Sequence, residues 1–219
     1  RANGTGLIER DIAEEYRAMS MGGNDDGFRR AYLNQWARPQ SATAIDPTSW
    51  ANLHGSTPPK ATPTFALDVA PDHSTATIAA AWSTPDGSWL QLADHRPGVE
   101  WVADRAAELL RTWGGRLLVE QTGTAAFLLP HLVAEGVSRR FFADACSTLD
   151  AAVVGRSVRH GGQDELKAAV AVARWSSSGE AGQRVLSRKD PRISPLIAAA
   201  LALHGLSSVP TSGGWMVGV

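Results

Sequence analysis

The chain has 219 residues, of which 43% are hydrophobic and 20% are charged, and its formal net charge is −1. This length can bury a core without cross-links, and the single cysteine, Cys146, excludes an internal disulfide and argues against a cysteine-based zinc site. The near-zero charge argues against a strongly basic nucleic-acid-binding protein, and no apolar run reaches the ~20 residues that span a bilayer.

The N-terminal part, residues 1–63, is expected to be a helical and irregular linker segment. Apolar residues recur at helical spacing within residues 4–36, with a break at residues 21–27. Residues 38–63 are rich in Pro, Ser and Thr. The chain opens on Arg1 rather than on methionine, so we expect a fragment of a longer polypeptide. The main domain is predicted to cover residues 64–219.

Three strands in a meander are expected to open this domain, because apolar and β-branched residues alternate between turn signals. A helix and a short, almost wholly apolar strand follow, and such a strand is typical of the centre of a sheet. The expected strands are 64–69, 74–82, 88–95 and 116–120, and the helix is 98–113.

The second half is predicted to alternate helices with short strands. The expected helices are 124–135, 145–158, 164–174 and 194–206, and the expected strands are 138–143 and 185–187. Three antiparallel strands followed by parallel crossovers predict an α/β fold with a ribonuclease H-like, mixed five-stranded sheet flanked by helices.

Asp68 and Glu120 are the candidate site residues, because each lies in an apolar strand where a carboxylate costs several kcal/mol unless it is paired or bound to a metal. The carboxyl ends of adjacent central strands converge on the site of an α/β sheet. Two close carboxylates favour a hard divalent cation, Mg²⁺ or Mn²⁺. The alternative for each acid is an ion pair with an arginine.

A two-ion nuclease site normally needs a third carboxylate, for which the sequence offers Asp190 and Asp164, with Asp72 as a weaker option. Asp164 could instead be a helix N-cap, and Asp190 could pair with one of the basic residues around it. Basic residues gather between residues 139 and 192, either as a solvated face or as a surface that follows a phosphate backbone. The DNA-binding candidates are Arg156, Arg159, Arg188 and Lys189.

Four segments in this order resemble the C-terminal nuclease domain of the terminase large subunit of tailed phages, of the kind found in actinobacteriophages. They are FALDVAPDHSTATIAAAW, LLVEQTGTAAFLLPHL, RHGGQDELKAAV and RISPLIAAALAL. The earlier GFRRAYLNQW is similar to the junction that follows the packaging ATPase in that family. The chain contains no Walker motif, as expected of an excised nuclease part.

The resemblance implies a metal-dependent endonuclease that cuts concatemeric double-stranded viral DNA during genome packaging in the host cytoplasm. It also implies a terminase small subunit and a portal protein as partners of the full-length protein. Asp68 and Glu120 match two of the family's metal ligands, whereas Ser194 stands where the family's third acid usually opens the last helix. Asp190, four residues upstream, is the predicted substitute catalytic acid.

Two other functions stay open from the sequence. The first is another enzyme on this fold, such as a junction resolvase or an integrase-like transferase. The second is a non-catalytic module that docks a portal or another packaging partner, with the third acid lost. A terminase-type nuclease is expected to show weak sequence preference and a steep dependence of DNA binding on salt.

Overall fold

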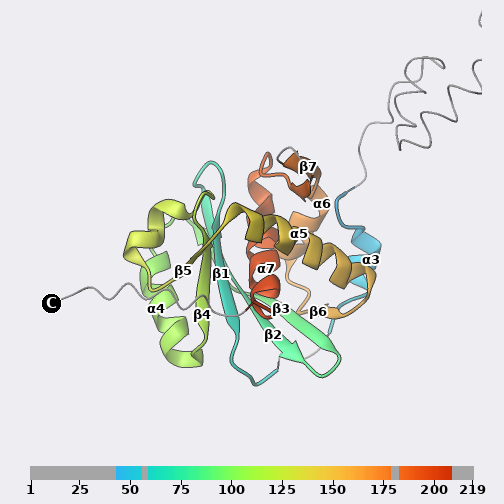
Figure 1. Cartoon of the computed structure of the whole chain (residues 1–219), viewed down its shortest axis with the longest axis horizontal. Coiled ribbons are helices and arrows are strands. Elements are labelled where there is room, and N and C mark those ends of the chain that lie inside the picture. The colour runs from blue at the N-terminus through green and yellow to red at the C-terminus, as the bar shows by residue number, and fades with distance from the viewer. Residues whose placement is uncertain (1–42, 56–58, 179–182, 209–219) are drawn as a thin grey trace, which may run out of the picture. The chain divides into compact units, whose positions relative to one another are not determined.

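The computed structural model describes residues 43–55, 59–178 and 183–208 (Figure 1). The helices that the sequence predicts within residues 4–36 lie outside these ranges. Within them, none of the helices combines the length and the apolar character that crossing a bilayer requires.

A mixed sheet is the centre of the domain, and its strand order in the described ranges is β5-β4-β1-β2-β3-β6. The first three strands are antiparallel neighbours, whereas β4 runs parallel to β1, β5 parallel to β4, and β6 parallel to β3. The strands are β1 Thr64–Val69, β2 Thr75–Thr84, β3 Gly87–Pro97, β4 Arg116–Glu120, β5 Glu135–Val137 and β6 Val158–His160.

This arrangement confirms the predicted ribonuclease H-like fold class, with one more strand than the five expected. The additional strand is β6, whose three residues pair with the start of β3. The sequence analysis ended a helix at Val158, because a three-residue strand is too short to show a period of its own.

Helices cover both faces of the sheet, which explains why β1 is buried along its whole length. One face packs against α4 and the 3₁₀ helix η1, and the other packs against α3, α5, α6 and α7. The helices are α3 Pro47–Ala51, α4 Val102–Trp113, η1 Ala126–His131, α5 Arg139–Val154, α6 Asp164–Val172 and α7 Ser194–Gly205.

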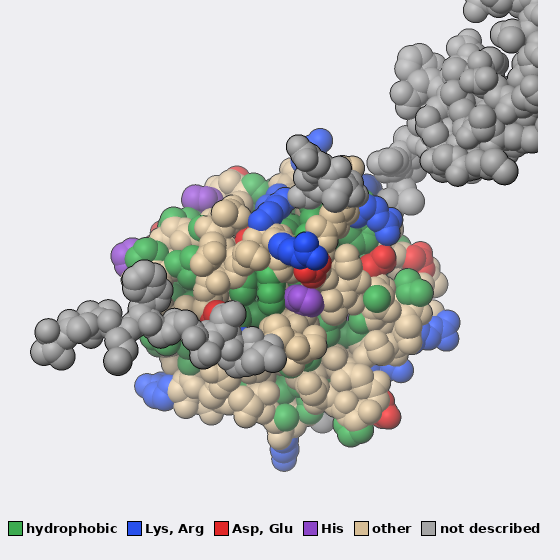
Figure 2. All heavy atoms as spheres, viewed as in Figure 1, with side chains coloured by type: hydrophobic (Ala, Val, Ile, Leu, Met, Phe, Trp, Pro, Cys, Tyr) green, Lys and Arg blue, Asp and Glu red, His purple; other side chains and the backbone are tan. Residues whose placement is uncertain are grey.

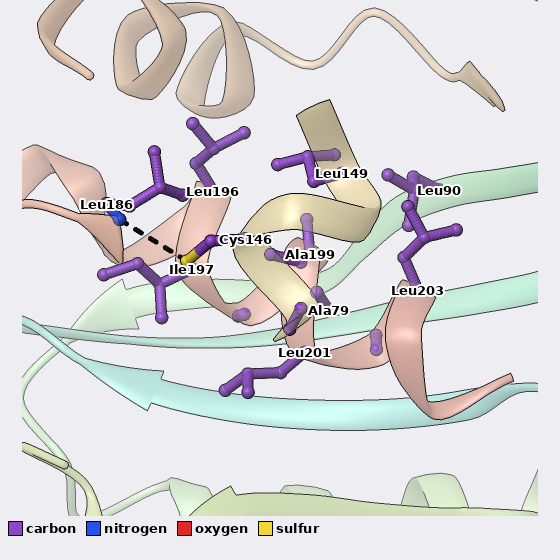
Figure 3. Close-up of a cluster of buried hydrophobic side chains, with 14 of the residues drawn as sticks. Ala79, Leu90, Cys146, Leu149, Leu186, Leu196, Ile197, Ala199, Leu201 and Leu203 are labelled. Atoms are coloured by element: carbon purple, nitrogen blue, oxygen red, sulfur yellow. Dashed lines mark hydrogen bonds between the residues drawn. The ribbon is translucent and has the colours of Figure 1, made fainter. Parts of the chain in front are cut away.

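The last helix, α7, lies between the sheet and α5, and all its residues except His204 are buried. Figure 3 shows Leu196, Ile197, Leu201 and Leu203 of α7 packed with Leu149 and Cys146 of α5. A helix in contact with neighbours on all sides has no polar face, as the run of Ala and Leu in this segment indicates. The helix predicted for residues 194–206 is confirmed, and its first turn is fixed against the sheet.

Two predictions between β4 and α5 were wrong. Residues 124–135 form a turn and η1 rather than an α-helix, since Pro130 lacks the N–H that a continuing helix needs. Residues 138–143 open α5 instead of forming a strand, because the Ser138 side chain accepts a hydrogen bond from the Phe141 N–H and caps the helix. The strand next to β4 is β5, directly before that cap.

Residues 43–55 pack on the same core as the sheet. The Ala44 N–H donates to the Ala173 carbonyl, and the Trp50 ring stacks on His160 with centroids 4.3 Å apart. The division of the chain at residues 63 and 64 stays a prediction. A separate hairpin of β7 (Trp175–Ser178) and β8 (Gln183–Leu186) includes the strand predicted near residue 185, and it leads through residues 187–193 into α7.

We expect Gly115→Ala to lower the free energy of unfolding by at least about 2 kcal/mol. Gly115 has a φ of +81° and begins the turn into β4, and a Cβ there would lie 2.0 Å from the backbone oxygen of Pro63. Urea denaturation followed by circular dichroism measures the loss. Gly161→Ala is the control, because the nearest atom to its Cβ would be 4.0 Å away. Equal stability of the two variants would contradict the prediction.

Candidate active site

Asp68 and Glu120 end two neighbouring strands and lie level with each other. β1 and β4 are parallel, with Leu67 opposite Val119, so the next residues in each strand are the two acids. Both side chains are only 2% exposed. Because side chains alternate along a strand, the acids share the face of Ala66 and Leu118, which packs against α5 and α7. The sequence prediction that the two acids meet is therefore matched by the topology.

Arg188 bridges the two carboxylates. Its Nη1 donates to Asp68 Oδ1 at 2.5 Å and to Thr124 Oγ1 at 2.8 Å, and its Nη2 donates to Glu120 Oε2 at 2.7 Å. The guanidinium carbon lies 5.0 Å from the ring centroid of Phe142. The arginine that the sequence analysis named as the alternative partner of each acid is thus one residue shared by both. Its side chain is only 17% exposed, so it is not on an open surface, and DNA binding by Arg188 stays a prediction.

Arg139 completes the set of charges around the pair. Its Nη1 lies 3.2 Å from Glu120 Oε1, to which the Thr122 hydroxyl also donates at 3.4 Å. Arg139 is half-exposed and packs over the same Phe142 ring, with its guanidinium carbon 5.0 Å from the centroid. Both oxygens of Glu120 are therefore engaged. The sequence analysis did not single out Arg139, because it saw this residue only as part of a basic run.

The remaining oxygen of Asp68 differs from the other three. Asp68 Oδ2 is buried and has no hydrogen-bond partner among the described residues. A buried carboxylate oxygen without a donor is costly, and in native proteins such an atom commonly marks a functional contact. This oxygen is the one atom of the pair that a further ligand can approach without displacing an arginine.

Hydroxyl side chains lie beside Asp68 where the family resemblance placed a third acid. The Ser194 hydroxyl, in the first turn of α7, is fully buried and donates to Thr77 Oγ1 at 3.3 Å. Thr77 lies opposite Asp68 in β2, and its Oγ1 is 2.7 Å from His95 Nδ1 in β3. These neutral groups can orient a ligand, but they add no negative charge to the two carboxylates.

The pKa of the Asp68 carboxyl lies far above its usual value. Burial raises this pKa to about 6, although the charge and hydrogen bonds of Arg188 and the nearby Ser194 hydroxyl lower it. The negative charge of Glu120 adds to the rise. Because the group titrates close to neutral pH, small changes in its surroundings decide whether it carries a proton.

The raised pKa predicts that Asp68 makes the metal-free protein less stable as pH increases. Its usual pKa is 3.8 and its folded value is about 6, so the favourable contribution is complete below pH 4 and is lost as pH rises through 6. Relative to Asp68→Asn, the wild type should lose about 3 kcal/mol of unfolding free energy between pH 4 and 7. Urea denaturation of both proteins in EDTA measures the difference, and a pH-independent difference would contradict this assignment.

The structure does not bring either proposed third acid to the pair. Asp190 caps the 3₁₀ helix η2 (Pro191–Ile193) and pairs with Arg192 at 2.8 Å, and hydrogen bonds from Arg192 lower its pKa. Asp164 is the first residue of α6, where Gln163, and not Asp164 as expected, holds the N-cap position. Across the ranges that the structure describes, no three His, Cys, Asp or Glu side chains are grouped so that they could hold a metal ion.

The other predicted DNA contacts lie in two different places. Arg159 is in β6 opposite Trp89, near the start of β3, whereas the acid pair is level with His95 near the end of β3. Arg156 lies just before β6, and its carbonyl accepts a hydrogen bond from Arg159. Lys189 directly follows Arg188 and is exposed. Of these residues, only Lys189 lies close in sequence to an element of the site, and DNA binding by all three stays a prediction.

The donor atoms around the pair fit one hard divalent cation. Asp68 and Glu120 offer carboxylate oxygens, and the hydroxyls of Thr124 and Ser194 lie next to them. The unpartnered Asp68 Oδ2 would gain a partner from such an ion. A cation that also contacts Glu120 must displace an arginine, because Arg188 and Arg139 hold its two oxygens.

Comparison with known proteins finds a likeness in fold but none in sequence. No protein-family model matches the chain, and neither does any curated protein. The HK97 bacteriophage large terminase has a TM-score of 0.60 at 19% identity, over 93% of this chain and 52% of that one. A large terminase from a thermophilic bacteriophage has a TM-score of 0.53 at 12% identity, over 92% and 52%.

A large terminase nuclease from the thermophilic phage G20c, solved with bound magnesium, has a TM-score of 0.48 at 12% identity, which is too low to add to the comparison. The two better matches show that this chain has the fold of phage large terminases. The chain spans about half the length of each of these two proteins.

Proposed function

We propose that this chain is the nuclease part of a terminase large subunit and that it cuts double-stranded DNA with the help of a divalent cation. The observation that carries the proposal is the buried pair of Asp68 and Glu120 at the ends of adjacent strands β1 and β4. The pair lies on a sheet with the ribonuclease H-like order, in a chain whose fold matches the large terminases of HK97 and of a thermophilic phage.

The energetic cost of the pair supports a functional role. Two carboxylates that are 2% exposed would be expensive to keep in an apolar sheet if they served stability alone. Residues held in a costly arrangement are enriched at functional sites, where the ligand or the reaction offsets the cost. Here the two acids would hold the cation, with the unpartnered Asp68 Oδ2 as the first point of contact.

A divalent cation at such a site supplies a water of lowered pKa and neutralises charge on the phosphate. The residues of the chain would place both reactants. Asp68 and Glu120 fix the cation, and the exposed Lys189 and half-exposed Arg139 offer positive charge to the DNA backbone. Figure 2 shows Lys and Arg side chains gathered over α5, which begins with Arg139 and Arg140. The two-ion arrangement predicted from the sequence would need a carboxylate besides these two.

The wider role is proposed from the fold and the family resemblance together. The substrate would be concatemeric viral DNA, cut in the host cytoplasm when a genome is packaged. A packaging ATPase in the same polypeptide, a small subunit and a portal would be the partners, because the chain spans about half of the full-length terminases that it matches.

A plasmid assay tests the proposal. Purified protein incubated with supercoiled plasmid and Mn²⁺ should produce nicked and then linear DNA, and EDTA should stop the reaction. Raising the salt from about 50 to about 200 mM should weaken DNA binding steeply, because phosphate contacts release counterions. Joined or branch-specific products would favour a transferase or a resolvase on the same fold.

The non-catalytic alternative has one observation in its favour. Arg188 and Arg139 already neutralise both acids, and Ser194 replaces the third acid expected from the resemblance. A module that only docks a packaging partner would leave the plasmid intact with Mg²⁺ or Mn²⁺, and neither metal would raise its melting temperature. Cutting or specific metal binding would exclude this alternative.

A further inference from the structure

We propose that Arg188 and a divalent cation compete for the same carboxylate oxygens, so that Arg188 is a built-in gate on the metal site. The inference rests on the proposed function, because it assumes that a cation binds at Asp68 and Glu120. It goes further by assigning Arg188 a role in regulating this site, which is distinct from binding DNA.

The first step is the occupancy of the oxygens. Arg188 holds Asp68 Oδ1 at 2.5 Å and Glu120 Oε2 at 2.7 Å, so its planar guanidinium spans the space between the two carboxylates. Arg139 holds the remaining oxygen of Glu120 at 3.2 Å. A cation bound by both acids would have to lie where the Arg188 guanidinium lies. The two occupants therefore exclude each other.

The second step is the balance of charge. Asp68 and Glu120 supply two negative charges, and Arg188 and Arg139 supply two positive ones. Adding a divalent cation to this buried group would leave an excess of positive charge that nothing compensates. A third carboxylate would absorb part of that excess, but the residue beside Asp68 is Ser194. The smaller number of acids thus makes the departure of Arg188 a condition for metal binding.

The third step is that Arg188 is able to leave. It belongs to the segment between β8 and η2 rather than to the sheet, and its side chain still reaches solvent, with 17% exposed. Its Nε has no hydrogen-bond partner among the described residues, so it is held through its two terminal nitrogens. When it leaves, the Thr124 hydroxyl keeps its hydrogen bond to the Val69 carbonyl. The frame of the site does not depend on Arg188.

Calorimetric titration with Mn²⁺ at about pH 7.5 tests the gate. Arg188→Gln removes the competing charge and should bind Mn²⁺ at least about ten times more tightly than the wild type. Arg188→Lys keeps the charge but cannot bridge two carboxylates with a planar fork, so its affinity should lie between the two. Arg184→Gln is the matched control, because Arg184 is an exposed arginine of β8 that pairs with Asp150, and its affinity should stay within about twofold of the wild type.

The outcomes separate the inference from the proposed function. Wild-type binding of Mn²⁺ with equal or weaker binding by Arg188→Gln would overturn the gate and leave the metal site standing. No binding by the wild type, Arg188→Gln or Arg188→Lys would overturn both. If Arg188→Gln folds poorly without metal, Arg188→Lys decides the question, since an affinity no higher than that of the wild type would overturn the gate.

Discussion

Asp68→Asn should reduce the rate of metal-dependent DNA cleavage at least ~100-fold, because it removes one of the two charges that hold the cation. The asparagine is close in size to the aspartate and can still accept a hydrogen bond from Arg188, so the strand should keep its place. Initial rates of plasmid linearisation in Mn²⁺ measure the effect, and the Mn²⁺ affinity should fall in parallel. Glu120→Gln should show a comparable loss.

Two further acids make this result specific. Asp150→Asn is the control, because Asp150 pairs with the exposed Arg184 on a different part of α5 and should keep the wild-type rate. Asp190→Asn tests the predicted third ligand, which the structure pairs with Arg192 instead. A loss as large as that of Asp68→Asn would show that Asp190 joins the site when metal and DNA bind. Full activity of Asp68→Asn would contradict the proposed site itself.

Arg188→Met should lower the free energy of unfolding by about 3–5 kcal/mol in EDTA at pH 8, since it leaves two buried carboxylates without their shared partner. The loss should be smaller at pH 5, where the raised pKa of Asp68 lets this carboxyl take up a proton and shed its charge. Urea denaturation at the two pH values, with equal slopes, measures both effects.

The double variant Arg188→Met with Asp68→Asn should recover part of the stability at pH 8, because one of the uncompensated charges is gone. Arg184→Met is the control for the loss of an arginine, and it should cost at most about 1 kcal/mol, since the Arg184 side chain is 63% exposed. An Arg188→Met variant as stable as this control would show that the bridge contributes little in solution.

Most of the fold could be predicted from local patterns. The strand Thr64–Val69, the strand Arg116–Glu120 and the buried helix from Ser194 were recognisable because burial on both sides leaves a continuous apolar run. The errors fell at residues 124–135 and 138–143, where a proline and a serine cap shifted the elements by several residues. Short strands such as Val158–His160 carry too few residues for a period to appear.

The sequence by itself determined the two acids. Asp68 and Glu120 were identifiable because a carboxylate within an apolar strand is costly, and because adjacent parallel strands bring their ends together. That reasoning needs only the strand that contains each acid and the order of strands in the sheet. It also named both possible fates of such an acid, which are a metal ion and an arginine.

Only the tertiary structure decided which partner each acid meets. Arg188 lies 68 residues after Glu120 and 120 after Asp68 in the chain, and its neighbour Asp190 is turned instead to Arg192. Nothing in the local pattern separates these two nearby charged residues, since both lie in the same loop. Their roles depend on how the hairpin and α7 pack on the sheet, because packing fixes which side chain enters the space between β1 and β4.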